Sequence, residues 1–495
     1  MTSYGTDLIV VLPELIVVAA ACLVLVLDPL TPFSRKELLA WLSLGSLALC
    51  IGLTGGQIGV LNLPLSAFND LVVVDSYARF WKLLLYGATG LTILMSLPYL
   101  KVEGLHLGEY YGFILLSLSG MMVMVSGADL LTIYLGTELM SLSLYVMAGL
   151  KRSSARSLEA SAKYFVLGAF SSGLLLYGIS LLYGLTGATK LSAIAGALSA
   201  KGLDDPMLLI ATILLTVGFG FKLAVVPFHM WTPDVYEGAP TAVTAFMAVA
   251  SKAASFAAFL RVFVEALGGL KADWSVLFVV LSVLTLALGN LVAIVQTNIK
   301  RMLAYSSIAH AGYALIGLAA AGRSGGESGG TFGIASVMLY LTFYAFMTLG
   351  AFALIAMFRK GGLEGDDIED FTGLAKRQPL AALIMLVFMV SLTGIPPTAG
   401  FIGKFYVFMA AVQSGLSWLA AVGLMFSAIS AYYYMRVVML MYMREPEAST
   451  AEPSHLVPSP ALSIVLACAV AGVILLGLYP SPVVSLALQS VLLLK

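Results

Sequence analysis

Long apolar runs follow one another along almost the whole chain, separated by short polar segments. A run of about 20 apolar residues can cross a bilayer as an α-helix, whereas barrel strands alternate apolar and polar residues. The runs predict an all-α polytopic membrane fold of roughly fourteen spans, at residues 8–28, 38–55, 76–99, 109–126, 128–150, 158–186, 206–230, 240–265, 275–298, 301–321, 332–358, 380–412, 416–443 and 459–478. The first run contains Pro13 and Glu14 and lacks a basic lead-in, so we expect a retained span and not a signal peptide.

Proline interrupts two of these predicted helices inside their apolar runs. The seventh contains Pro227, and the twelfth contains TGIPPTAG from Thr393 to Gly400. Because proline removes a backbone hydrogen bond, a break at membrane depth needs partners from protein or water. Two broken helices five spans apart, each with a nearby lysine, predict two related halves of opposite orientation, as in inverted-repeat transporters whose ion sites lie at such breaks.

The whole chain, 1–495, is expected to form one transmembrane domain. Its predicted parts are N-terminal helices in 1–108, a first five-helix repeat in 109–265, a second in 275–443 and a C-terminal helix in 444–495. The longest polar insertions, 359–378 and 444–459, are too short for a separate core. The pieces 60–65 and 71–74 of the loop after the second span are candidates for a small hairpin.

Basic residues are concentrated in alternate loops. With the N-terminus outside, the inside loops contain Arg35, Lys36, Lys101, Lys151, Arg152, Arg156, Lys300, Arg301, Arg359, Lys360, Lys376, Arg377 and Arg444. The outside loops then contain only Lys190, Lys201, Lys271, Arg323 and Lys495. Because such a bias sets membrane orientation, it predicts an even number of spans, with both termini on the periplasmic side of a bacterial inner (plasma) membrane.

Composition supports this class of protein and narrows its chemistry. Hydrophobic residues make up 60% of the chain, charged residues 11%, and the mean hydropathy is +1.00, whereas globular domains are roughly 45–50% apolar and about 25% charged. The zero net charge argues against a nucleic-acid partner. Cys22, Cys50 and Cys468 are far apart, and the sequence has no glycine-rich nucleotide loop, cysteine cluster or histidine pair. We therefore expect no cofactor, metal or redox centre in this chain.

Three lysines and one glutamate lie deep in predicted helices, namely Lys222, Lys252, Lys404 and Glu138. An ionisable group at mid-bilayer costs at least a few kcal/mol unless it is paired or hydrated. Removal from water makes a lysine release its proton more readily, so lysines in a hydrated path suit proton transfer. They suit sodium poorly, because an ammonium repels the ion.

Structural alternatives remain for each lysine. Lys252 could be held by backbone carbonyls, and Lys222 could extend to the inner surface. Lys404, after the second break, is expected to be the positional counterpart of Lys222. Lys163 lies four residues after Glu159, which is also the spacing of an ordinary surface ion pair.

The remaining candidates are Glu138 and two histidines. Glu138 needs a cationic partner, for which Lys163 and Lys222 are the candidates. His229 follows Lys222 by two turns and shares its face if the helix is regular, and it either relays protons or caps the break. His310, near the middle of the tenth span, either links the two halves or is hydrogen-bonded in the core. Five further charges near span ends are expected to be interface anchors or ion pairs: Asp75, Arg79, Lys82, Arg261 and Glu265.

Four motifs carry most of this chemistry: VPFHMWTPDVYEGAPTAVTAFMAVASKAASFAAFLR, DLLTIYLGTELMSLSLYVMAG, NIKRMLAYSSIAHAGY and TGIPPTAGFIGKF. Together they closely resemble subunit N of the proton-pumping NADH–quinone oxidoreductase (respiratory complex I), one of its antiporter-like membrane subunits. The resemblance covers nearly the whole chain. Sister subunits L and M and multisubunit cation/proton antiporters share the fold, but WTPDVYEGAPT and ELMSLSLYV are closer to N. No long lateral helix follows the fourteenth span, which argues against L.

The resemblance implies an antiporter-like fold whose two inverted repeats are the fourth to eighth and ninth to thirteenth helices. It also implies that Glu138, Lys163, Lys222, Lys252 and Lys404 carry a proton path along the membrane midplane. The enzyme would be a translocase of the respiratory chain, with flavin and iron–sulfur clusters in partner subunits. The implied partners are neighbouring antiporter-like and small membrane subunits, the lipid bilayer and protons.

These inferences lead to the hypothesis of a proton-translocating subunit. A charge change at Glu138 alters how tightly Lys222 and Lys163 hold their protons, and Lys252 then passes a proton toward Lys404, which exchanges it with the far side. One alternative is a subunit of a multisubunit sodium/proton antiporter, and another is a scaffold whose charges do no transport. Ferredoxin-using relatives and membrane hydrogenases would share the fold.

Overall fold

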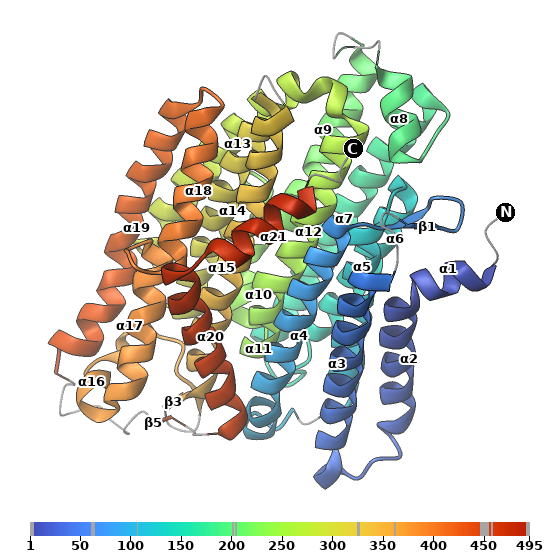
Figure 1. The fold of residues 1–495 in the computed structure, drawn as a ribbon. Coiled ribbons are helices and arrows are strands. Elements are labelled where there is room, and N and C mark those ends of the chain that lie inside the picture. Colours follow the sequence, from blue (N-terminus) through green and yellow to red (C-terminus); the bar gives the residue numbers. More distant parts are fainter. Residues whose placement is uncertain are drawn as a thin grey trace.

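A bundle of membrane-length helices makes up nearly all of the computed structural model (Figure 1). The structure describes residues 4–60, 65–105, 107–199, 202, 205–323, 327–360, 363–445, 455–456 and 459–491. The helices are α1 (Tyr4–Val10), α2 (Leu12–Leu27), α3 (Glu37–Val60), α4 (Ser76–Val102), α5 (Glu109–Ser126), α6 (Leu130–Ala148), α7 (Ala155–Thr186), α8 (Leu191–Leu198), α9 (Pro206–Leu223), α10 (Thr232–Gly238), α11 (Thr241–Phe246), α12 (Lys252–Arg261), α13 (Lys271–Ala293), α14 (Ile299–Arg323), α15 (Glu327–Met357), α16 (Leu374–Arg377), α17 (Pro379–Thr393), α18 (Ala399–Gln413), α19 (Ser417–Met443), α20 (Pro460–Leu478) and α21 (Ser481–Val491).

The prediction of an all-α membrane bundle is confirmed. Among the described residues, twelve helical spans are long and apolar enough to cross a membrane. The other two predicted spans correspond to α2, of 16 residues, and to the pair α17 and α18 on either side of a break. One span is composite: a π-helical turn at Met247–Ser251 joins α11 to α12, and a second at Val262–Ala266 extends α12, which gives one continuous helix.

Three spans form the core of the bundle. The composite span Thr241–Ala266 is entirely buried by other helices, and α14 and α15 are almost entirely so. Glycines allow the closest approaches: a Cβ on Gly289 of α13 would meet the Ala309 backbone of α14 at 2.7 Å. The core helices therefore hold their polar side chains away from both lipid and water.

Both predicted helix breaks are present, but the first lies earlier in the chain than predicted. α9 ends at Leu223, where Ala224 adopts the left-handed conformation, and α17 ends at Thr393, where Gly394 does so. The seventh span was expected to continue to residue 230, but it stops at Leu223 and α10 is a separate helix. In Figure 1, α9 lies above α10 while α17 lies below α18, so the two broken pairs run in opposite directions.

A second local pattern recurs in both halves. Asp129 caps α6 and forms a β-bridge with Lys190, whereas Asn298 precedes α14 and forms a β-bridge with Asp367. Each capping side chain accepts from the first backbone N–H groups of its helix, which have no partner within the helix. The halves thus share their helix starts and their breaks, while the repeat boundaries stay a prediction.

Short elements at the ends of the bundle were only partly predicted. Strands β1 (Leu65–Ala67) and β2 (Val72–Val74) pair antiparallel, so a hairpin is present. Its first strand begins at the end of the predicted piece 60–65, of which Val60 ends α3 and residues 61–64 lie outside the described residues. The small sheet of β4 (Leu363–Glu364), β3 (Phe358–Lys360) and β5 (His455–Leu456) joins the two longest polar insertions. α8 and α21 were not predicted, because each is too short for a span. α21 packs across α15 and α4.

Candidate functional site

Lys222 is buried in the last turn of α9 and contacts α6. Its ammonium donates to Ser141 Oγ at 2.7 Å and to Tyr145 OH at 3.4 Å. Both partners are neutral hydroxyls, which can accept a hydrogen bond and donate another. The predicted burial of Lys222 is confirmed, since its side chain is 4% exposed and does not extend to a surface.

Glu138 lies one turn before Ser141 on α6, in the same cluster of side chains. It is half-buried and accepts a short hydrogen bond from Ser172 of α7. The expected direct ion pair with Lys163 or Lys222 is not present among the described residues. The Ser141 hydroxyl, which accepts from Lys222, donates to the carbonyl of Thr137, and Glu138 accepts from Ser172, so the two charges have separate hydrogen-bond partners.

Lys252 begins α12, directly after a π-helical turn, and is almost fully buried. Its ammonium donates to the carbonyl oxygen of Ser307 at 2.6 Å and to its hydroxyl at 2.5 Å. A backbone carbonyl, the structural alternative predicted for Lys252, is thus one of its two partners, and a hydroxyl is the other. Both contacts are with α14.

His310 lies at the centre of a buried hydroxyl cluster. Its Nδ1 is 2.6 Å from the hydroxyl of Tyr340 on α15, and its Nε2 is 3.2 Å from the hydroxyl of Tyr434 on α19. The Tyr434 hydroxyl also contacts Ser306 of α14 at short distance. His310 is therefore hydrogen-bonded in the core, and the same bonds connect three helices of the second half.

Lys404, in the second turn of α18, reaches back across the second break. Its ammonium donates to the carbonyl oxygens of Leu392 at 3.2 Å and Thr393 at 2.8 Å, and to Ser427 Oγ at 2.8 Å. These carbonyls belong to the last turn of α17, which has no further helical N–H groups to accept from. Lys404 follows its break whereas Lys222 precedes its own, so the expected positional equivalence was wrong.

One face of α14 connects the lysines of the two halves. Ser307, His310 and Tyr313 follow one another at three-residue spacing, which places them on one side of the helix. Lys252 binds Ser307, and the Lys404 ammonium is 4.7 Å from the ring centre of Tyr313. α14 therefore spans the distance between two buried lysines with side chains that can hydrogen-bond.

Lys163 borders a charged cleft, through its pairs with two of the lining residues, and is only partly buried. It pairs with Glu159 at 2.6 Å, as the surface alternative predicted, and with Asp234 of α10 at 2.7 Å. Arg301 of α14 pairs with the other oxygen of Asp234 at 2.7 Å and with Glu237 at 2.9 Å. The cleft, of about 190 Å³, is lined by Arg156, Glu159, Ala160, Asp234, Glu237, Gly238 and Arg301.

Asp234 is the centre of this cleft. Burial raises the pKa of its carboxyl, but hydrogen bonds from Lys163 and Arg301 outweigh burial and hold the pKa below its ordinary value. Its two cationic partners lie on α7 and α14, which belong to different halves. Asp234 therefore ties the halves together as an ionised carboxylate at neutral pH.

His229 lies in the segment between α9 and α10 and is half-buried. The condition for a shared face, a regular helix from Lys222 to His229, is not met, because α9 ends at Leu223. Its Nδ1 is buried with no hydrogen-bond partner among the described residues.

Several contacts of the candidate residues were not predicted from the sequence. Ser141 and Tyr145 follow Glu138 by three and seven residues, a spacing that would have placed them on its face. The charges near span ends form pairs: Lys82 with Glu14 at 2.5 Å and Arg261 with Asp75 at 2.9 Å, all buried.

Within the part of the chain that the structure describes, no group of His, Cys, Asp and Glu side chains is arranged to hold a metal ion.

The sequence profile of the family described as NADH:quinone oxidoreductase/Mrp antiporter, TM, matches residues 127–430. NADH-quinone oxidoreductase subunit N 2 of Rhizobium meliloti (strain 1021) is 48% identical over 97% of this chain and 96% of the relative. A chain of respiratory complex I from Thermus thermophilus has a TM-score of 0.78 at 33% identity, over 96% of this chain and 98% of that one.

A chain of the Mrp complex from Dietzia sp. DQ12-45-1b has a TM-score of 0.80 at 22% identity, over 99% of this chain and 97% of that one, which shows a common fold. The profile covers more than half of the chain, and the relative from Rhizobium matches it almost from end to end. The chain therefore belongs to the NADH:quinone oxidoreductase/Mrp antiporter family of membrane subunits, alongside the NADH-quinone oxidoreductase subunit N proteins.

Proposed function

We propose that this chain is a proton-translocating membrane subunit of an NADH–quinone oxidoreductase, with electron transfer in partner subunits. The contacts of Lys222, Lys252 and Lys404 carry the proposal. Each ammonium binds hydroxyl or carbonyl oxygens, and none has a carboxylate within ion-pair distance among the described residues. A lysine held in this way can lose its proton without leaving an unpaired carboxylate in the bilayer.

The contacts support an order for the path. Glu138 and Lys222 form its first part, since Lys222 binds Ser141, one turn after Glu138 on α6. A negative charge on Glu138 favours a protonated Lys222, and neutralising that charge favours proton release. The proton then passes to Lys252, and from Ser307 along α14 toward Lys404.

His310 is the proposed relay within the second half. Its two ring nitrogens contact the hydroxyls of Tyr340 and Tyr434 on different helices. A neutral imidazole donates through one nitrogen and accepts through the other, so it can exchange roles with hydroxyl neighbours as a proton passes.

We place one opening of the path at the charged cleft around Asp234, which Lys163 borders. Lys163 would exchange protons with water there, and His229 lies in the segment between this cleft and Lys222. The loops at this end carry most of the basic residues, so we place it on the inside of a bacterial inner membrane, with both termini periplasmic. Thiol labelling of intact cells should modify Lys271→Cys and spare Lys101→Cys; the reverse pattern would contradict this orientation.

The central test is proton pumping by the assembled complex in vesicles. Lys222→Ala and Glu138→Ala should each lower the number of protons moved per electron, because each removes a charge from the first part of the path. Lys190→Ala, at a partly exposed lysine paired with Asp70, is the matched control and should pump normally. Unchanged stoichiometry in both path variants would overturn the proposal.

The second candidate is a subunit of a multisubunit sodium/proton antiporter, favoured by the shared fold with the Mrp complex chain. Affinity purification of this chain in mild detergent separates the two functions. Co-purified flavin and iron–sulfur proteins support the oxidoreductase. Transport activity in a preparation without them supports the antiporter.

A further inference from the structure

The backbone between α17 and α18 is exposed at the depth of the membrane. Ile395 is 40% exposed, and Pro396 and Pro397 are exposed as well. α17 and α18 have 15 residues each, which corresponds to a length of about 22 Å at a rise of about 1.5 Å per residue. Because the hydrocarbon core of a bilayer is about 30 Å thick, a break between two such helices lies well inside it.

This exposed segment contains backbone acceptors without partners. The Ile395 carbonyl accepts from Thr398 Oγ1 at 2.7 Å. The carbonyls of Gly394 and Pro396 accept no hydrogen bond from the described residues. Irregular backbone at membrane depth is tolerated only where protein buries it or where it lines water. The exposed break therefore needs a source of hydrogen-bond donors.

The Lys404 ammonium lies directly behind this segment. A Cβ atom on Gly394 would lie 3.3 Å from Lys404 Nζ, and glycine has no side chain to fill that space. Gly394 is itself partly exposed, and Lys404 is 4% exposed. Only the backbone of the break therefore separates the ammonium from the surroundings of the bundle.

Neighbouring helices close other sides of the Lys404 site. The ammonium is 4.7 Å from the ring centre of Tyr313 on α14, a core helix. At the end of the break, a Cβ on Gly477 of α20 would meet Thr398 Cα at 2.8 Å, so α20 packs tightly there. The exposed part of the break is thus confined to residues 394–397.

The first break is closed at the corresponding point. Ala224, its left-handed residue, is 1% exposed. The nearby Val226 amide donates to Thr285 Oγ1 of α13 at 3.1 Å, so the protein itself satisfies this segment. Lys222 binds hydroxyls of α6 and not the backbone of its break. The two breaks therefore differ in exposure where their first helices end.

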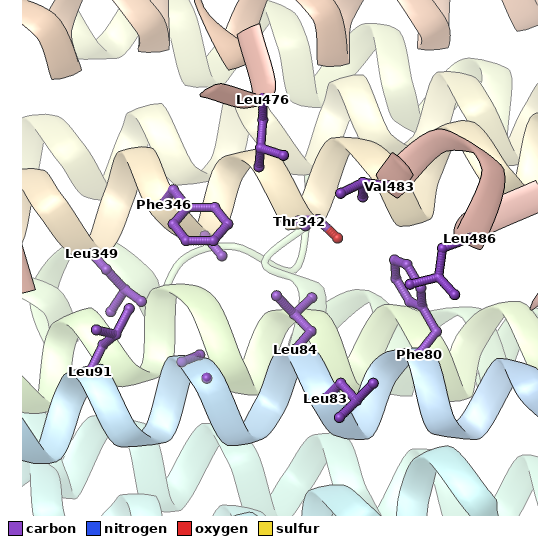
Figure 2. Close-up of a pocket in the computed structure, with 13 residues that line it drawn as sticks. Phe80, Leu83, Leu84, Leu91, Thr342, Phe346, Leu349, Leu476, Val483 and Leu486 are labelled. Atoms are coloured by element: carbon purple, nitrogen blue, oxygen red, sulfur yellow. The ribbon is translucent and has the colours of Figure 1, made fainter. Parts of the chain in front are cut away.

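An apolar cavity elsewhere in the bundle provides a dry reference. It lies between α4, α15, α20 and α21, and its lining includes Phe80, Leu84, Phe346, Leu476 and Val483 (Figure 2). Thr342 is the one polar residue among its described lining residues, and that hydroxyl already donates to the Met338 carbonyl. Because apolar cavities stay free of water, an exposed lining residue such as Gly87 marks a surface without hydration.

We propose that water reaches the Lys404 ammonium through the exposed break at Gly394, which makes this break the second opening of the proton path. This proposal rests on the proposed function, in which Lys404 exchanges protons with the far side. Water supplies the donors that the Gly394 and Pro396 carbonyls need. It replaces the Leu392 carbonyl, the most distant of the three acceptors of Lys404 at 3.2 Å. The proton then moves from Nζ to the water oxygen, and the lysine is left as a neutral amine.

The test is thiol labelling of the assembled complex in nanodiscs, which leave both membrane faces open to water. A charged, water-soluble methanethiosulfonate reacts with thiolate, so it labels a cysteine that contacts water. Ile395→Cys should react about tenfold faster than two references at membrane depth. One is native Cys468, an exposed residue within α20. The other is Gly87→Cys, at a site where a Cβ would meet nothing within 4 Å.

Peptide mass spectrometry of this chain measures the labelling, so cysteines of partner subunits do not interfere. A rate at Ile395→Cys no higher than at Cys468 and Gly87→Cys would overturn the proposal, because lipid or a partner subunit would then cover the break.

A second measurement separates water access from proton exchange. Labelling of Ile395→Cys should lower the number of protons moved per electron relative to the same variant before labelling, because the attached group covers the break. Full pumping after complete labelling would overturn the role of the break as an opening. Labelling rates do not depend on pumping, so this outcome is distinct from failure of the proposed function, which normal pumping by Lys222→Ala and Glu138→Ala would show.

Discussion

The two broken helices place a buried lysine at the same kind of interruption but on opposite sides of it. In the first half Lys222 precedes the left-handed Ala224, and in the second half Lys404 follows the left-handed Gly394. Counted from the left-handed residue, Lys404 occupies the position that Asp234 occupies in the first half. At the same distance along the chain, the first half has an acid and the second half a base.

The buried lysines Lys222 and Lys404 also differ in their hydrogen-bond partners. Lys222 contacts hydroxyls beside Glu138, so its charge can respond to a neighbouring carboxylate. Lys404 contacts the carbonyls that end α17, so its charge is bound to the backbone of the break. Under the proposed function, Lys222 would respond to a charge change at Glu138, and the protonation of Lys404 would be coupled to the geometry of the break.

The largest expected effect is the loss of proton translocation in variants of Lys222 and Lys404, which should differ in thermal stability. Lys222→Met and Lys404→Met should both abolish most proton translocation by the assembled complex. Lys404→Met should also destabilise it by about 1–3 kcal/mol, because the buried Leu392 carbonyl loses its partner, whereas the Thr393 carbonyl still accepts from Ser427. Pumping in vesicles and the thermal unfolding of the same preparations measure both. Equal stability of the two variants would contradict the distinction.

A matched pair of substitutions at the breaks should have the next largest effect. Gly394→Ala should destabilise by about 1–2 kcal/mol, because an L-residue is strained in the left-handed region. Its Cβ would also meet Lys404 Cδ at 2.9 Å. Ala224→Gly should instead stabilise by about 1 kcal/mol. Thermal unfolding measures both, and shifts of the same sign would show that the breaks are not comparable.

The caps at the equivalent helix starts should differ less. Asp129→Ala and Asn298→Ala should each cost about 1 kcal/mol of unfolding free energy. Asp129 should cost more, since it also accepts from Thr189 Oγ1 at 2.5 Å. Leu131→Ala, at an exposed first-turn residue of α6, is the control. Denaturation should rank the variants in that order.

The smallest effect concerns pH. Lys163 and Arg301 hold the pKa of Asp234 below its ordinary value of 3.8, so its contribution is complete above that value and is lost as pH falls through the lower, folded-state pKa. Because the site is partly exposed, the contribution should stay below about 1 kcal/mol. Asp234→Asn should flatten the acid limb of the stability profile, and an unchanged limb would contradict this assignment.

The sequence predicted the helical bundle, the burial of Lys252 and Lys404, and the second break, because each depends on a local pattern of apolar residues, charges and prolines. It misplaced the end of the seventh span. Ala224 ends α9 in a conformation that alanine seldom adopts, so no residue type marked the stop.

The partners of the buried charges were harder to predict for another physical reason. Ser307 and Tyr434 are common core residues, and only the packing of α14 against its neighbours brings them to Lys252 and His310. Likewise Lys82 was predicted to be an interface anchor or part of an ion pair from its position near a span end. Its partner, Glu14 at 2.5 Å, comes from α2, which the sequence did not indicate. Cross-helix contacts depend on helix rotation, which hydrophobic pattern alone does not fix.

The three acceptors around Lys404 have a consequence for motion. A charged lysine has three N–H donors, and here three oxygens accept from it. A neutral amine has two donors, so each departing proton must free one oxygen, whether at the end of α17 or at Ser427. Under the proposed function, the break between α17 and α18 would then lose and regain one hydrogen bond in each turnover. A probe of local mobility placed at this break would therefore report each change in the protonation of Lys404.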